Sequence, residues 1–79
     1  MTEHIGMVDA IRYQRIKKGL SPRALSLKAG LSASYVGKLE RQEIEPSIGV
    51  FARIALVLDM NPRETFYCIR MAAMERESS

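Results

Sequence analysis

The sequence contains one cysteine, one histidine and no tryptophan among its 79 residues. A single cysteine, Cys68, excludes an internal disulfide framework, and with His4 as the one histidine a zinc site is not expected. We therefore predict no metal and no cofactor. The sequence also lacks a run of about 18 apolar residues, which a membrane helix needs, and no signal-peptide pattern opens it. A cytoplasmic protein is expected.

Patterns typical of catalysis are lacking too. The sequence shows no carboxylate pair suited to acid–base chemistry, no Ser-His or Cys-His arrangement and no glycine-rich phosphate loop. A chain this short buries only roughly 60% of its unfolded surface, which leaves little room for a deep cleft. We predict one small domain over residues 1–79, with a core of about 7–75 and frayed ends, that is not an enzyme.

Basic residues are concentrated in one part of the chain. The segments 1–11, 12–41 and 42–79 carry net charges of −2, +7 and −2, and the basic segment contains a single acid, Glu40. A basic segment in an otherwise slightly acidic domain indicates a polyanionic partner. The same charges could form a solvated helix surface, and charge alone does not decide between the two.

Residues that begin and end helices divide the sequence into five expected helices, at about 7–18, 22–29, 33–41, 47–58 and 62–75. Ser21 is a good N-cap before the proline that starts the second helix, and Asn61 repeats that signal before the fifth. Glycine can end a helix in the left-handed conformation, as expected at Gly19 and Gly30, and Ser32 is expected to cap the third helix. Apolar residues recur at helical spacing, most clearly in the stripe Ile48, Phe51, Ile54, Ala55 and Leu58. The prediction is an all-α fold.

The short segments 22–29 and 33–41 are joined by Ala29-Gly30-Leu31-Ser32. Glycine at the bend permits a positive φ at low steric cost, and such a tight turn between short helices is typical of a helix-turn-helix. Further signals surround the turn in a fixed order: Gly19-Leu20-Ser21, Leu25, Ser34-Tyr35-Val36, Lys38-Leu39-Glu40-Arg41, Pro46-Ser47, Ala55 and Leu58.

With these residues, about 8–66 of the chain resembles the lambda-repressor-like, Cro-type helix-turn-helix domain of phage and bacterial regulators. The resemblance implies a compact five-helix domain that binds double-stranded operator DNA as a symmetric dimer and acts as a transcription regulator, such as a repressor. The helix 33–41 would enter the major groove of a palindromic operator. Which operator, and whether the protein represses or activates, the sequence does not decide.

The resemblance assigns base reading to Ala33, Ser34 and Lys38, with Gly37 between them. Lys38 could donate to guanine, Ser34 could donate or accept, and Ala33 could contact a thymine methyl group. Lys38 could equally bind a phosphate, and Ser34 could be a solvated serine. Gly37 would allow close approach of the backbone to DNA.

Phosphate contacts are expected from Ser21 and Arg23 at the start of the second helix, where free N–H groups face an anion, and from Arg41 after the third. Tyr35 resembles the aromatic residue of the family at this position, which packs half-buried and could place its hydroxyl on a phosphate. The sequence departs from the family at Pro22, where a glutamine that binds phosphate is usual. It departs again after Arg41, where acidic Glu43 and Glu45 replace glycine and basic residues and are expected to weaken DNA binding. Ser26 replaces a closely packed alanine, and its hydroxyl can bond back to a carbonyl.

Arg15 and Glu40 occupy positions at which family members form a partly buried ion pair between the first and third helices. A buried pair of this kind would orient the recognition helix. The alternative is two surface charges worth less than about 1 kcal/mol.

The last expected helix carries two apolar stripes, Phe66, Ile69 and Ala73 on one side and Tyr67, Met71 and Met74 on the other. One stripe is needed to close the core, and the other would form a homodimer interface, for which Tyr67, Met71 and Met74 are the candidates. Cys68 is expected to be a small packing residue. A different class of function stays open: a protein-interaction module that docks a protein partner through the acidic segment and this helix. Steep salt dependence would distinguish a DNA-binding protein from such a module.

Overall fold

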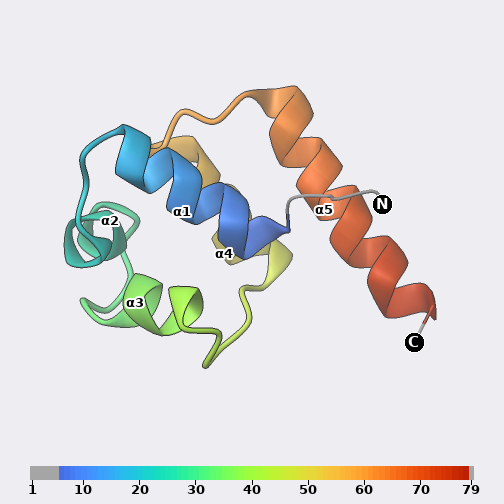
Figure 1. The fold of residues 1–79 in the computed structure, drawn as a ribbon, viewed down its shortest axis with the longest axis horizontal. Helices are drawn as coiled ribbons and strands as arrows, with labels where there is room; N and C mark the ends of the chain where they lie inside the picture. Colours follow the sequence, from blue (N-terminus) through green and yellow to red (C-terminus); the bar gives the residue numbers. More distant parts are fainter. Residues whose placement is uncertain (1–5, 79) are drawn as a thin grey trace.

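The computed structural model describes residues 6–78, which fold into five α-helices without a strand in that range (Figure 1). The helices are α1 (Met7–Lys17), α2 (Pro22–Lys28), α3 (Tyr35–Glu40), α4 (Ile48–Val57) and α5 (Pro62–Ser78). The predicted all-α class and helix order are confirmed. Among these helices none is both long enough and apolar enough to span a membrane.

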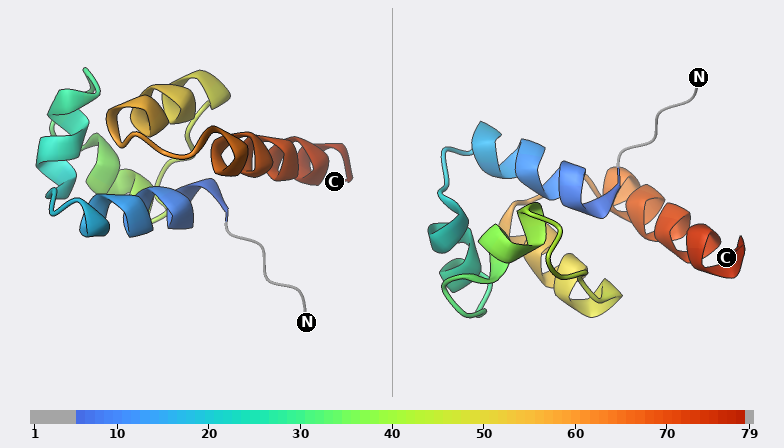
Figure 2. Two further views of the ribbon diagram at one scale, coloured as in Figure 1. Left: turned by 90° about the horizontal axis from the view of Figure 1, so that it is seen from above. Right: turned by 60° about the horizontal axis from the view of Figure 1, so that its bottom comes forward.

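One hydrophobic core lies between α1, α2, α3, α4 and the first half of α5. Its largest fully buried side chains come from the first four helices and from the residue that follows α4: Ile11, Leu25, Val36, Leu39, Phe51, Ile54 and Leu58. The ribbon shows α1 crossing over α4, with α2 and α3 beside them at one end (Figure 1). The C-terminal half of α5 extends beyond this body in every view (Figure 2).

The apolar stripe predicted in α4 is confirmed at four of its five positions. Phe51, Ile54, Ala55 and Leu58 are buried, but Ile48 is 41% exposed. Ile48 is the first residue of the helix, directly after the cap, and the first turn extends past the core.

The core side of α5 differs from the predicted stripes. Phe66 is 65% exposed and Ala73 is exposed as well, whereas Cys68 is 1% exposed and Ile69 packs beside it. The spacing of Phe66, Ile69 and Ala73 was therefore wrong as a guide to the core face, because α5 packs on the body through a narrow strip centred on Cys68. The expectation that Cys68 is a packing residue is confirmed, and its burial raises the pKa of the thiol.

The first four helices all end in the same hydrogen-bonded motif. The amides of Leu20, Leu31, Glu43 and Met60 each donate to the carbonyl five residues earlier, at 2.9–3.1 Å. The residue before each of these amides has a positive φ: Gly19 and Gly30, as predicted, but also Gln42 at 62° and Asp59 at 54°. This arrangement is the Schellman motif, in which glycine is favoured because other residues are strained.

The start of α3 corrects one sequence prediction. The helix begins at Tyr35 rather than 33, and Ser34, not Ser32, is the N-cap residue, without a side-chain cap hydrogen bond. Tyr35 N–H bonds to the carbonyl of Ser32, which gives a turn ahead of the helix, so Ala33 and Ser34 precede its first residue. By contrast, the Ser21 and Asn61 caps form as predicted, accepting from Ala24 N–H and Arg63 N–H.

Candidate nucleic-acid interface

A buried serine links the two helices of the helix-turn-helix. Ser26 Oγ donates to the carbonyl of Pro22 at 2.8 Å, as the sequence suggested. The same oxygen accepts from Val36 N–H at 2.9 Å, and both residues are fully buried. Val36 N–H is one of the first amides of α3 and has no partner within its own helix. The hydroxyl therefore fixes α3 against α2 by satisfying that amide.

Arg15 and Glu40 form the predicted ion pair, and it is largely buried. Arg15 Nε and Nη2 donate to the two carboxylate oxygens at 2.6 and 2.8 Å, and their side chains are 13% and 8% exposed. Arg15 Nη1 donates to the carbonyl of Leu20 at 2.8 Å. The hydrogen bond with Glu40 raises the pKa of Arg15, so the guanidinium stays charged. The pair attaches the end of α3 to α1.

Arg12 adds a contact that the sequence analysis missed. Its Nη2 donates to the backbone carbonyl of Glu40 at 2.7 Å, and its Nε lies 3.5 Å from the carboxylate. Arg12 lies three residues before Arg15, and residues at that spacing share one face of a helix. The sequence could therefore have predicted that both arginines contact Glu40. Two arginines of α1 thus hold one glutamate of α3.

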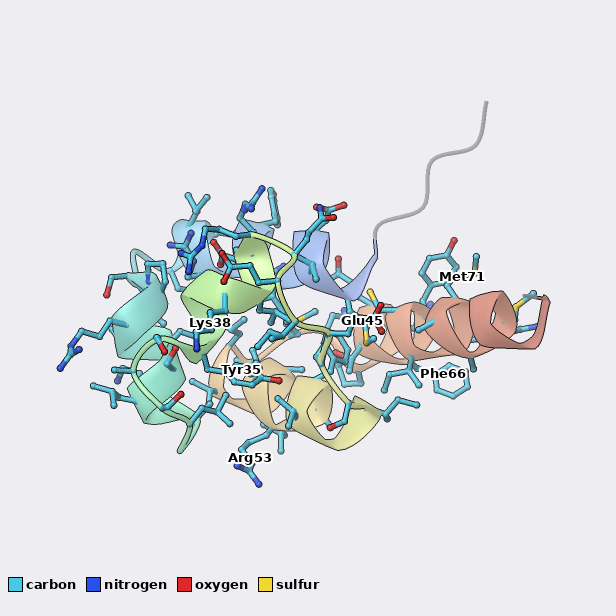
Figure 3. The ribbon with its side chains drawn as sticks, turned by 90° about the horizontal axis from the view of Figure 1, so that it is seen from below. Tyr35, Lys38, Glu45, Arg53, Phe66 and Met71 are labelled. Atoms are coloured by element: carbon cyan, nitrogen blue, oxygen red, sulfur yellow. The ribbon has the colours of Figure 1, made fainter. Side chains whose placement is uncertain are left out.

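These contacts divide α3 into a buried and an exposed side. Val36, Leu39 and Glu40 are buried, whereas Lys38 and Arg41 are exposed. Of the base-reading candidates, Ser34 and Lys38 are exposed and Ala33 is half-buried. Figure 3 shows Lys38 beside Tyr35, which is half-buried and packs against the core. The structure brings these candidates to one surface.

The phosphate-contact candidates Ser21, Arg23 and Arg41 are all exposed, and Tyr35 is half-buried. Ser21 and Arg23 are exposed at the start of α2, where the Ser21 hydroxyl serves as the cap. At the end of α3, Arg41 Nε donates to Glu43 Oε2 at 2.7 Å, with 61% and 51% of the two side chains exposed. The hydrogen bond from Arg41 lowers the pKa of Glu43. Glu43 is therefore bound to a basic residue of the same surface, and Glu45 is exposed nearby in the sequence.

The dimer-interface candidates are accessible. Tyr67 is 46% exposed and Met74 50%, and Met71 is half-buried. They do not line an apolar hollow of about 470 Å³ that lies between α4 and α5. The strongly exposed Leu56 and Phe66 border that hollow. The sequence analysis missed the contribution of α4 because Leu56 adds to the surface only once α4 and α5 are placed side by side.

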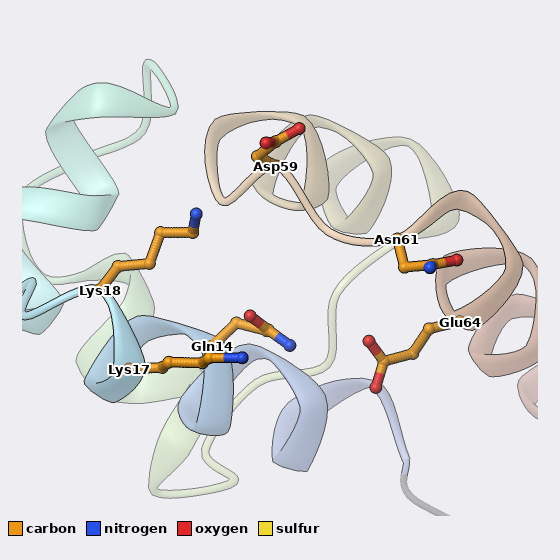
Figure 4. A pocket seen from close by; sticks show the side chains of 6 residues that line it. All are labelled: Gln14, Lys17, Lys18, Asp59, Asn61 and Glu64. Atoms are coloured by element: carbon orange, nitrogen blue, oxygen red, sulfur yellow. The ribbon is translucent and has the colours of Figure 1, made fainter.

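A second, polar hollow of about 580 Å³ lies between α1 and the start of α5 (Figure 4). Its lining combines two lysines, two carboxylates and two amides: Gln14, Lys17, Lys18, Asp59, Asn61 and Glu64. None of them belongs to α2 or α3, so this hollow is separate from the candidate interface. Among the side chains that the structure describes, those of residues 6–74, no group of three or more His, Cys, Asp or Glu is placed to hold a metal ion.

The comparisons with known proteins agree with this geometry. Residues 11–64 match the model of a protein family described as helix-turn-helix. Over 59 residues, 75% of this chain, the sequence is 36% identical to the uncharacterized HTH-type (helix-turn-helix) transcriptional regulator y4dL of Sinorhizobium fredii, although the chain spans only 29% of that relative's length. No solved structure matches the chain significantly. Because the family match covers more than half of the chain and includes α2 and α3, the chain belongs to the Cro-type helix-turn-helix family.

Proposed function

We propose that this chain binds double-stranded DNA sequence-specifically and thereby regulates transcription. The observation that carries the proposal is the two-sided character of α3: Val36 and Leu39 face the core, Glu40 is held by two arginines of α1, and Lys38 on the other side is exposed. A short helix fixed in this way can enter the major groove, which is about 12 Å wide.

In this proposal Ser34 and Lys38 contact base edges and Ala33 contacts a thymine methyl group. Arg23, with the start of α2, and Tyr35 would contact phosphates on either side of the groove. The basic segment 12–41, with a net charge of +7, would supply the general attraction to DNA.

The proposed regulator is a homodimer that binds a palindromic operator. Supporting this, Tyr67 and Met74 expose apolar surface on α5, and the apolar hollow beside α4 adds Leu56 and Phe66. Two-fold association is the commonest way to cover such a face, and it would place two copies of α3 about 34 Å apart along the duplex.

The test is selection of binding sites from random duplex DNA, followed by affinity measurements at several salt concentrations. We expect an enriched palindrome and a steep loss of affinity as salt rises. Lys38→Ala should weaken binding and relax the preference at one base position, whereas Arg23→Ala should weaken binding to all sequences about equally. Arg63→Ala, which removes the same charge from exposed α5, is the matched control and should change neither.

A second candidate function is a protein-interaction module, favoured by the apolar hollow of about 470 Å³ between α4 and α5. In that case α2 and α3 serve as scaffold, and a protein partner covers Leu56 and Phe66. This function would be supported over the first if the selection from random DNA enriched no sequence and the chain did not bind DNA at physiological salt.

A further inference from the structure

On α3, the side chain of Arg41 lies where a side chain at Gly37 would otherwise be. A Cβ atom added at Gly37 would lie 3.2 Å from Arg41 Nη1, closer than ordinary van der Waals contact. The Arg41 side chain therefore extends back along α3 by one turn instead of projecting from the end of the helix. Gly37 costs about 1 kcal/mol of helix propensity relative to alanine, and this packing gives its presence a structural reason.

Arg41 is also held from the other side. Its Nε donates to Glu43 Oε2 at 2.7 Å, so the guanidinium lies between a carboxylate and the backbone of Gly37. The charge of Lys38 contributes to lowering the pKa of Glu43, after the larger effect of the Arg41 hydrogen bond. Lys38, Arg41 and Glu43 thus form one cluster at the end of the recognition helix.

From this arrangement we infer that Arg41 reads a guanine in the major groove, with Glu43 as the residue that positions it. The inference rests on the proposed DNA-binding function and names a base-reading residue where the sequence pattern indicated a phosphate contact. Gly37 and Arg41 are four residues apart, so Arg41 lies on the side of α3 on which Gly37 lies, one turn further along.

Two features favour a base over a phosphate as the partner. The carboxylate of Glu43 offsets the guanidinium charge, which reduces its attraction to a phosphate and would repel the phosphate itself. With Nε bound to Glu43, the terminal amino groups still present N–H donors in a planar fork, which matches the O6 and N7 acceptors of guanine. Gly37 has no side chain, so it does not obstruct the guanidinium on this side of α3.

Three variants test the inference by site selection and by affinity for single-base operator variants. Arg41→Lys keeps the charge but loses the fork, and it should lose the preference for guanine at one position of each half-site, by roughly ten- to a hundredfold. Gly37→Ala keeps every charge, favours the helix and makes Arg41 Nη1 shift by a few tenths of an ångström, so it should lose the same preference in part. Glu43→Gln should weaken the same preference while leaving the other positions unchanged. Arg63→Lys, at an exposed position of α5 outside the proposed interface, is the matched control and should leave every base preference unchanged.

The outcomes separate this inference from the proposed function. If the wild-type chain enriches a site and both Arg41→Lys and Gly37→Ala keep every base preference, Arg41 does not read a base, although the DNA-binding function stands. If the wild-type chain enriches no duplex sequence, the proposed DNA-binding function and the base-reading role of Arg41 are both refuted. The inference is supported if the variants lose the preference for guanine at one position while the affinity of Gly37→Ala keeps the salt dependence of the wild-type chain.

Discussion

Replacing Glu40 by alanine tests the contact that holds the recognition helix. The substitution removes the carboxylate that accepts two hydrogen bonds from Arg15, at 2.6 and 2.8 Å. Arg15 is then left with the carbonyl of Leu20 as its hydrogen-bond partner in a site where its side chain is 13% exposed. Arg12 also loses a carboxylate 3.5 Å from its Nε, but keeps its bond to the backbone carbonyl.

The expected loss follows from the burial of the pair. Removing one partner of a buried ion pair costs about 3–5 kcal/mol, since the remaining charge stays desolvated. For a domain of this size each kcal/mol lowers the melting temperature by roughly 4–8 °C. Glu40→Ala should therefore lower the melting temperature by about 12 °C or more.

Thermal unfolding followed by circular dichroism measures the effect, and the chain supplies its own control. Arg41 and Glu43 form a pair with the same chemistry and a similar distance of 2.7 Å, but with 61% and 51% exposure. Glu43→Ala should therefore lower the melting temperature far less than Glu40→Ala, because exposed ion pairs contribute little to stability. In a double-mutant cycle with Arg15→Ala, the two losses should be far from additive. A shift below about 1 °C for Glu40→Ala, or equal shifts for the two glutamates, would refute the reasoning from burial.

Three further predictions concern single residues. Ser26→Ala should cost about 1–3 kcal/mol, because it leaves the buried amide of Val36 without an acceptor, whereas the exposed Ser32→Ala should change little; denaturant unfolding and amide exchange at Val36 check this. Gln42→Gly should stabilise the fold by roughly 0.5–1 kcal/mol, because it relieves a φ of 62°, and Gln42→Ala should not. Burial raises the pKa of Cys68, so the native thiol should react slowly with a thiol reagent at pH 8. The unfolded thiol ionises first, above about pH 8.5, so stability should fall as pH rises beyond that value, and Cys68→Ala should abolish this dependence.

The sequence predicted what depends on local signals. Helix order, the glycine-ended turns and the Arg15–Glu40 pair follow from residues whose effects act within one turn or through a spacing typical of the family. Buried positions of α4 followed from a period of 3.6 residues, because that helix packs along most of its length. The prediction failed at Ile48, since periodicity does not tell how far the core extends along a helix.

Features that depend on the angle between helices were not predictable in this way. The strip of α5 that meets the core is centred on Cys68, and only the docking of α5 on α1 and α4 decides this against Phe66. The contact of Ser26 with Val36 spans the helix-turn-helix and needs both helices in place. The later start of α3 has a local cause instead, because Tyr35 N–H is satisfied by the carbonyl of Ser32 in the turn that precedes the helix.

The end of α3 differs physically from the ends of α1, α2 and α4. In the Schellman motif the residue after the left-handed position commonly makes an apolar contact with the preceding helix. Leu20, Leu31 and Met60 occupy that position and lie in or against the core, whereas Glu43 is 51% exposed and binds Arg41. The residue before it, Gln42, has a positive φ without being glycine, a property that the α3 end shares with the α4 end at Asp59. The chain thus has a strained residue and a polar contact at the one helix end that would meet DNA. An apolar residue at position 43 could anchor the end of α3 in the core, but it could not orient Arg41. The lower local stability at this end is therefore consistent with selection for DNA recognition by Arg41.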